Sequence, residues 1–280
     1  MRKILLFALL VLTALPLAAQ QTPLKFPAIS QHASVSQTVG LTDVTITYSR
    51  PGVKGRQIWG ALVPYDKPWR TGANDATTIS FSDDVTINGQ NLAKGTYAFF
   101  AIPTANDWTL IFNKTAKQWG SFSYDASADA LKVTAKPEKA PFTEWLTYDF
   151  PKVSSDTATV VLRWENLAIP FTVNTNTTAK VIAAAREAVA GAKPDDWSTP
   201  YRAASFAFNN GLNDDASKWL DASLKAKETL SNLYLKARMQ AKAGQNAAAV
   251  KTAEQALKLA TEKDKEVADE INASIKSWQK

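Results

Sequence analysis

The feature of this sequence that most constrains its fold is a change of composition near Asn174. From about Phe26 to Asn174 the chain is rich in Thr, Val, Ile and aromatic residues and is divided by Gly, Pro and Asn. After Thr177 it is rich in Ala, Lys, Leu and Glu. β-Branched and aromatic residues favour strands, whereas Ala, Leu, Lys and Glu favour helices. We therefore expect a β part followed by a helical part.

The first part has the pattern of an antiparallel sheet protein. Apolar and polar residues alternate over 43–48 and over 159–164, as they do in half-buried strands. Asn88-Gly89 predicts a type I′ hairpin turn, because both of its central positions need positive φ. Eight further segments are candidate strands, namely 33–38, 77–82, 85–87, 96–102, 108–113, 131–135, 144–150 and 169–173. With no helical pattern between them, these strands predict an all-β antiparallel sandwich, jelly-roll-like in form.

The second part contains an internal repeat. Small and apolar residues recur after 33 positions, where Ala204, Gly211, Ala216 and Leu220 return as Ala237, Gly244, Ala249 and Ala253. Alanine lets two helices approach closely and glycine permits the turn between them, so the pattern resembles the tetratricopeptide helix–turn–helix repeat. An ordinary helical bundle is the alternative, and Ser223 departs from the repeat where a small core Ala is expected. Two pairs are fewer than such arrays need, so we expect the helices to lean on the β part.

Three helix ends in this part can also be predicted. Gly191 is expected to end the first helix in the left-handed conformation. Thr199-Pro200 is typical of an N-cap followed by proline at the first helical position. Asp214-Asp215 fits the start of a helix, where carboxylates complement the helix dipole.

The first twenty residues have the features of a secretory signal peptide. Met1–Lys3 is basic, Ile4–Leu17 is almost wholly apolar, and Ala18 and Ala19 are small. An uncleaved anchor or a buried helix is the alternative, but the apolar run is shorter than the roughly 20 residues that span a bilayer. We expect cleavage after Ala19 or Gln20, a periplasmic or extracellular location, and no transmembrane span in the mature chain.

These patterns divide the chain into three expected regions, and composition excludes several kinds of site. The regions are a signal peptide (1–20), a β-sandwich domain (21–175) and a small all-α tetratricopeptide-like domain (176–280). The chain has no Cys and a single His, His32, so disulfides, thiolate zinc sites and multi-histidine metal sites are excluded. No phosphate-binding loop and no G-x-G-x-x-G motif are present, so we predict no cofactor and no metal. Basic and acidic residues are interspersed in the helical part, which argues against a nucleic-acid partner.

Residues 49–76 are the candidate ligand-binding segment. This Pro- and Gly-rich stretch lacks strand periodicity and places basic residues among aromatic ones. Arg binds carboxylates or phosphates through two parallel hydrogen bonds, and aromatic faces stack on sugars or cations, so an anionic or glycan-like ligand is one interpretation. The other is structural: Trp59 and Trp69 close the open end of the sandwich, while the Arg side chains pair with Asp66, Asp75 or backbone carbonyls. The candidate residues are Arg50, Lys54, Arg56, Trp59, Tyr65, Trp69, Arg70 and Asn74.

The same segment carries a family resemblance. The motifs are Ser49-Arg50-Pro51, Lys54-Gly55-Arg56, Trp69-Arg70-Thr71-Gly72-Ala73-Asn74, Lys94-Gly95-Thr96-Tyr97, Ile102-Pro103, Trp108 to Lys114, and Trp119-Gly120. Over residues 26–174 the chain resembles the exported domain of unknown function 2911 family of Gram-negative bacteria. The resemblance implies a β-rich exported domain with a helical, tetratricopeptide-like tail. It implies no reaction, ligand or catalytic residue.

Three functional hypotheses follow. The first is an exported non-catalytic binding or scaffold protein, in which the sandwich recognises a ligand and the helices bind a protein or peptide. The second is a periplasmic enzyme, a glycan-acting hydrolase that uses acids such as Asp66 or Asp75 near Arg70. The third is structural assembly in the envelope. We favour the first, because the only histidine is His32, no G-x-S-x-G motif is present and no catalytic residue stands out.

Overall fold

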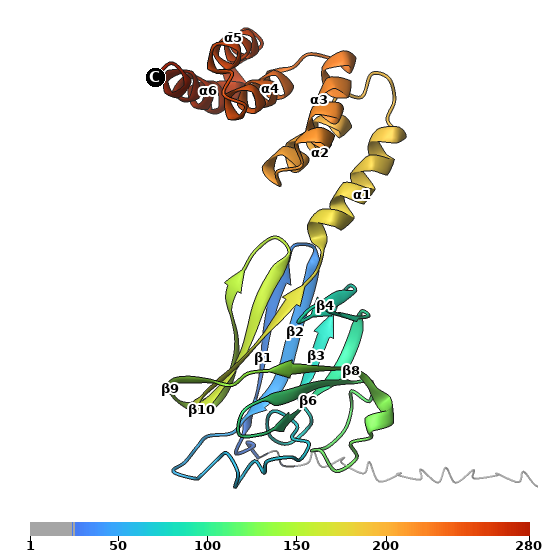
Figure 1. Cartoon of the computed structure of the whole chain (residues 1–280), viewed down its shortest axis with the longest axis vertical. Coiled ribbons are helices and arrows are strands. Elements are labelled where there is room, and N and C mark those ends of the chain that lie inside the picture. Colours follow the sequence, from blue (N-terminus) through green and yellow to red (C-terminus); the bar gives the residue numbers. More distant parts are fainter. Residues whose placement is uncertain (1–23, 25) are drawn as a thin grey trace, which may run out of the picture.

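The computed structural model of the chain describes residue 24 and residues 26–280. The expected signal peptide, residues 1–20, lies outside the described residues. Within them, two antiparallel sheets are followed by a series of helices (Figure 1), which confirms the predicted β-sandwich and helical part.

The larger sheet has six strands, and its inward side chains form part of the main core. Its strands run in the order β1 (Gln31–Val39), β2 (Thr42–Arg50), β3 (Thr78–Phe81), β6 (Gly95–Pro103), β7 (Trp108–Asn113) and β8 (Asp129–Ala135). Their side chains alternate as predicted: Val44, Ile46 and Ile79 are fully buried, whereas Thr45 and Thr47 face outward and are half-buried.

The smaller sheet faces the first one. It has the order β5 (Gln90–Leu92), β4 (Val85–Ile87), β10 (Thr157–Asn174) and β9 (Glu138–Val153). Asn88 and Gly89 have φ values of 47° and 84°, which confirms the type I′ turn between β4 and β5. Residues 159–164 and 169–173, predicted as two strands, form the single strand β10. No Gly or Pro lies between them. The strand contains a β-bulge at Glu165 (φ 55°) and continues past it without a break.

The helical part consists of consecutive antiparallel helices. They are α1 (Thr177–Ala190), α2 (Ser198–Asn209), α3 (Asn213–Ala226), α4 (Leu230–Lys242), α5 (Asn246–Leu257) and α6 (Lys265–Trp278). Gly211 and Gly244 each take φ 77° between paired helices, α2 with α3 and α4 with α5. Ala204, Ala216 and Ala237 are fully buried, as the repeat predicts. Asp214 and Asp215 lie in the first turn of α3, where they were expected.

The other two predicted helix ends are wrong in detail. Gly191 has φ −89°, so α1 ends without a left-handed residue. Thr199 is the second residue of α2 rather than its cap, because the carboxylate of Asp196 accepts the N–H groups of Ser198 (3.0 Å) and Thr199 (3.1 Å). A charged acceptor satisfies these first donors more strongly than a hydroxyl would.

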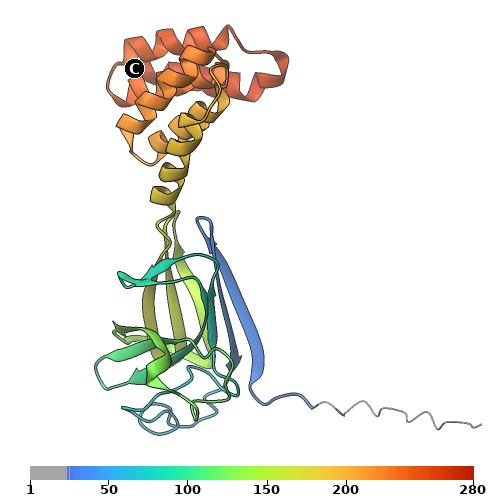
Figure 2. The same cartoon turned by 90° about the vertical axis from the view of Figure 1, so that its right-hand side faces the viewer.

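The paired helices do not pack against the sandwich, so the expectation that they lean on the β part is also wrong. α1 continues from β10 and carries the other helices away from the sheets (Figures 1 and 2). The paired helices bury their apolar faces against one another, in clusters that include Trp219, Leu235 and Ile271, and this removes the need for support from the sheets. Among the described residues, no helix is both long and apolar enough to cross a membrane.

The joint between the two parts is polar. Lys180 in α1 donates to Asp83 at 2.6 Å, and Thr178 donates its backbone N–H and its hydroxyl to Asp156 at 2.7 and 2.6 Å. Gly40, in the β1–β2 turn (φ +61°), lies so close that a Cβ there would overlap the side chain of Thr177. The joint is therefore closely packed although it contains few apolar groups.

Candidate functional site

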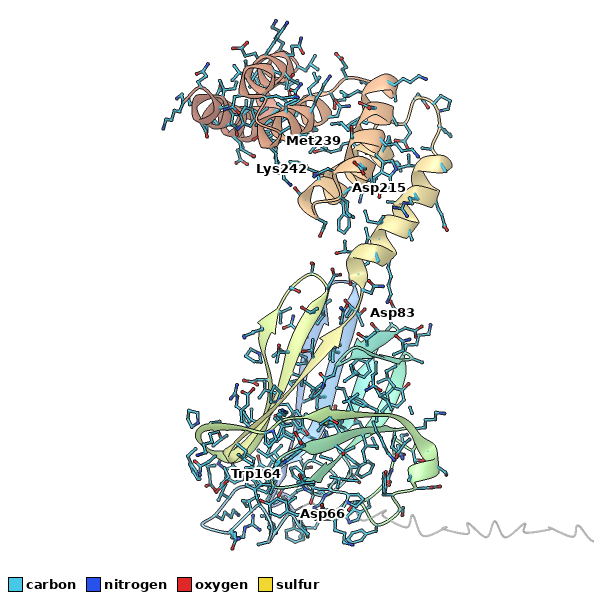
Figure 3. All side chains as sticks on the ribbon, viewed as in Figure 1. Asp66, Asp83, Trp164, Asp215, Met239 and Lys242 are labelled. Atoms are coloured by element: carbon cyan, nitrogen blue, oxygen red, sulfur yellow. The ribbon has the colours of Figure 1, made fainter. Side chains whose placement is uncertain are left out.

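The segment between β2 and β3 closes the end of the sandwich farthest from the helices with a cluster of four tryptophans. Trp59 and Trp69 from this segment pack with Trp108 of β7 and Trp164 of β10 (Trp164 is labelled in Figure 3). The ring centroids of Trp59 and Trp108 are 4.9 Å apart, and Trp69 stacks on Trp164 at 5.9 Å. This packing agrees with the structural interpretation of the two loop tryptophans.

Backbone hydrogen bonds fix the segment in place. Trp69 and Ala101 of β6 exchange two bonds of 2.8 and 2.9 Å, and the hydroxyl of Thr71 donates to the carbonyl of Phe99. The phenol of Tyr148 donates to the carbonyl of Thr71 at 2.9 Å, and burial raises the pKa of Tyr148 above its ordinary value. The segment is irregular in conformation, but it is bonded to both sheets.

The first two arginines of the segment bind carbonyl and hydroxyl oxygens. Arg50 donates to the carbonyl of Leu146 (2.9 Å) and to the hydroxyl of Thr147 (2.5 Å). Arg56 donates to two carbonyl groups of its own loop, at 2.6 and 3.1 Å. Among the ion pairs between described residues, none joins an arginine to Asp66 or Asp75. The carbonyl partners match the structural interpretation, and the expected carboxylate partners do not occur.

The remaining candidates occupy different places. The ammonium of Lys54 lies 5.9 Å from the ring centroid of Trp145. Arg70 is half-buried, its Nε finds no partner within the described chain, and desolvation lowers the pKa of its guanidinium. Asn74 donates to the carbonyl of Ser30 at 2.9 Å. The eight candidates therefore do not converge on one pocket.

Two of the candidates, Trp59 and Tyr65, do line a cavity of about 510 Å³, which we call the tryptophan-end cavity. Its charged residues, Asp107, Lys136, Lys139 and Glu165, are not among the residues that the sequence predicted for a site. They come from distant segments, and no local motif marks them; only the fold brings them together. The buried indole N–H of Trp59 has no hydrogen-bond acceptor in the described part of the chain.

A second concave site lies between α2, α4 and α6, and we call it the inner groove. This cavity of about 580 Å³ is lined by Phe208 of α2, by Tyr234, Arg238, Ala241 and Lys242 of α4, and by Glu270, Ser274 and Trp278 of α6. The side chains of Arg238 and Lys242 lie 5.3 and 4.8 Å from the ring centroid of Phe208. Tyr234 donates to Glu270 at 2.9 Å and bonds Ser274 at 2.9 Å, and burial is the main cause of the raised pKa of its phenol.

Comparison with known families identifies the β part. The model of the family described as Protein of unknown function (DUF2911) matches residues 30–173. The chain belongs to the DUF2911 family. No curated protein and no solved structure matched it. The matched DUF2911 region takes in both sheets and the tryptophan-end cavity and ends before α1, so the inner groove lies outside it.

Two carboxylates of the DUF2911 region have lowered pKa values. Hydrogen bonds to Lys180 and to Ser127 lower the pKa values of Asp83 and Asp125, respectively. Lowered values favour ionised, pairing carboxylates over proton donors. In the part of the chain that the structure describes, no three His, Asp or Glu side chains gather where they could hold a metal ion.

Proposed function

We propose that this DUF2911 protein is an exported, non-catalytic binding protein that holds an acidic protein or peptide segment in its inner groove. The observation that carries the proposal is the placement of two cationic side chains, Arg238 and Lys242, over one aromatic ring, that of Phe208, in a concave site between α2, α4 and α6. Stacked helix pairs typically bind extended ligands along such concave surfaces.

The charges of the groove favour an acidic ligand. Glu270 already accepts a hydrogen bond from Tyr234, whereas the ammonium of Lys242 faces the ring of Phe208 and has no carboxylate partner among the described residues. An arriving carboxylate would pair with this cation, and the neighbouring aromatic rings would exclude water from the pair. Trp278 adds apolar surface for a ligand side chain.

Export and the role of the sandwich are parts of the same proposal. The basic and apolar residues at the start of the chain support export. The tryptophan-end cavity offers the sandwich a recognition site for an anionic or glycan-like ligand, with Lys136 and Lys139 as cations and Tyr65 as an exposed ring.

The test is peptide binding by the full mature chain. Fluorescent random decapeptides enriched in Asp and Glu, in neutral residues, or in Lys and Arg would be compared by fluorescence anisotropy. We expect acidic peptides to bind. Lys242→Ala should weaken their binding by at least about tenfold, since a charge-assisted hydrogen bond contributes about 1.5–3 kcal/mol. Lys236→Ala, on the exposed side of α4, is the matched control and should not change binding. Equal binding of the three pools, or an equal effect of both variants, would refute the acidic-peptide groove.

A second candidate function rests on a specific observation. Asp107 and Glu165 both line the tryptophan-end cavity. Glu165 has a strained backbone at the β10 bulge, and strained backbone at a bulge occurs at active sites. Two carboxylates brought into one cavity are what a glycan hydrolase requires, although these are not Asp66 and Asp75. Release of reducing sugar from a glycan by the wild type, lost in both Glu165→Gln and Asp107→Asn, would establish this enzyme and overturn the non-catalytic proposal.

A further inference from the structure

The outer face of the larger sheet presents an uncharged array of hydroxyl groups. Seven outward positions of β1, β2 and β3 carry only Ser or Thr; in space they lie between His32 at one end and Asp43 at the other. They are Ser34, Ser36, Thr38, Thr45, Thr47, Thr78 and Ser80. We call these residues the hydroxyl face. Their inward neighbours, such as Val44, Ile46 and Ile79, are fully buried in the core. β1 and β2 lie at the outside of the sandwich (Figure 2), where the face is open to solvent.

The strand register orders these hydroxyls into rows. Ser36 bonds Thr45 at 2.8 Å, Thr45 lies opposite Ser80, and Ser80 bonds Thr96 at 2.8 Å. A second row runs from Ser34 to Thr47 (3.3 Å) and on to Thr78. Strands are spaced by about 4.8 Å. The hydroxyls of Ser34 and Ser36 also lie 3.2 and 3.4 Å from backbone carbonyl oxygens, and that of Thr38 donates to Asp43 at 2.6 Å. Each hydroxyl oxygen has two acceptor lone pairs, so the face keeps capacity to accept further hydrogen bonds. The face therefore offers a regular set of acceptors.

A cavity opens at the His32 end of this face. It has a volume of about 540 Å³, and its lining includes Thr47 and Thr78 of the face together with His32, Asp75, Gln118 and Trp119. Trp119 is 61% exposed, which is unusual for so large an apolar ring. The side-chain oxygen of Gln118 is buried and has no donor in the described structure.

The exposed indole is held by a fixed backbone. Gly120 donates to the carbonyl of Asn74 at 3.0 Å, and Ala76 donates to the carbonyl of Gln118 at 2.9 Å. Asp75 and Trp119 form an isolated bridge between these two bonds. The ring is thus presented by a backbone that is already ordered, which reduces the entropy lost on binding.

From this arrangement we propose that an uncharged glycan chain binds along the hydroxyl face, with one sugar ring stacked on Trp119. The apolar face of a pyranose ring packs on an aromatic ring, and its hydroxyls bond to planar groups such as those of His32, Asp75 and Gln118. The rows of Ser and Thr then meet the hydroxyls of the following sugars. An anionic polymer would find no cation among the seven residues of the face; the lysine that lines the cavity, Lys117, lies outside the face.

The test uses the full mature chain and three soluble neutral hexasaccharides: a β-1,4-glucan, an α-1,4-glucan and a β-1,4-linked N-acetylglucosamine oligomer. Isothermal titration calorimetry should detect binding of at least one of them. Trp119→Ala should weaken this binding about tenfold, a loss typical of one aromatic contact. Thr45→Val, which removes one hydroxyl at nearly constant volume, should weaken it by a smaller factor.

Two matched controls separate this site from general effects. Phe122→Ala removes another highly exposed ring that does not line the cavity, and Thr134→Val removes a hydroxyl from β8 of the same sheet. Both should bind like the wild type. The proposal is overturned if no hexasaccharide binds up to its solubility limit, if Trp119→Ala binds as the wild type does, or if only anionic polymers such as polygalacturonate bind. Because the inner groove is on the helices, the acidic-peptide result would be unaffected by these outcomes.

Discussion

At the scale of single residues, the four tryptophans at the end of the sandwich combine a stabilising and a costly property. Trp108 and Trp164 are each only 1% exposed, so they contribute large apolar areas to the core. The indole N–H groups of Trp59 and Trp164 nevertheless have no acceptor within the described residues, and a buried unpaired donor costs about 1–3 kcal/mol. The cluster is therefore maintained by ring packing.

The size of this packing contribution can be measured at Trp108. Trp108→Ala should lower the free energy of unfolding by about 3–5 kcal/mol, because the surrounding rings cannot collapse into the space left behind. Urea unfolding followed by circular dichroism would measure the loss. Phe142→Ala, at a position 58% exposed on β9, is the control and should change stability by less than about 0.5 kcal/mol. Similar losses in the two variants would contradict a tightly packed cluster.

At the scale of elements, Ser223 explains why the second half of the first helix pair departs from the repeat. Its hydroxyl donates to the carbonyl of Trp197 at 2.8 Å and accepts from the amide of Asn232 at 3.0 Å. Both Ser223 and Asn232 are fully buried, and Asn232 also caps the start of α4 through Thr229. The serine therefore joins α3 to α4 and to the chain before α2, a connection that alanine could not make.

Ser223→Ala should consequently destabilise the helical part, although it restores the repeat pattern. The change leaves the amide of Asn232 with one bond fewer and the carbonyl of Trp197 without this donor, which costs about 1–3 kcal/mol. Thermal unfolding followed at 222 nm would detect the change. Ser217→Ala, at an exposed position on the same helix, should be neutral or slightly stabilising, because alanine has the higher helix propensity. A stabilising effect of Ser223→Ala would show that its hydrogen bonds are dispensable.

At the scale of the whole molecule, the two parts meet through a small polar joint. The ammonium of Lys180 is the main cause of the lowered pKa of Asp83, whose ordinary value is 3.8. A carboxyl with a lower pKa in the folded state adds stability above its ordinary pKa and loses it as the pH falls through the folded value. Both side chains are more than a third exposed, so the contribution is no more than about 1 kcal/mol.

The joint therefore predicts a small, pH-dependent difference between the wild type and Lys180→Met. The wild type should be slightly more stable at about pH 7, and the difference should vanish once the pH falls through the lowered pKa of Asp83, which lies under 3.8. An NMR titration of the Asp83 carboxyl should also show its pKa rising toward the ordinary value in the variant. Stability curves that remain parallel down to the lowest pH would exclude a contribution from this ion pair.

Sequence patterns predicted the parts of this fold that depend on local periodicity. Alternation at Val44 and Ile46, and the Asn88-Gly89 turn, follow from the chemistry of a few adjacent residues, and both are confirmed. The placement of Arg50 and Arg56 required knowledge of which carbonyls lie nearby, so two interpretations stayed open. Asp107 and Glu165 line one cavity only because β10 continues past Arg163. No pattern in the sequence predicts that these two side chains lie close together.

The continuity of β10 with α1 also has a mechanical consequence. β10 is an inner strand, bonded to β9 along much of its length and to β4 near its end. If a partner bound to the helices pulls on the chain, the force passes through Thr175 and Asn176 into this strand and loads several ladder hydrogen bonds at once. The helix pairs have no such ladder between them and would give way first, leaving the sandwich folded.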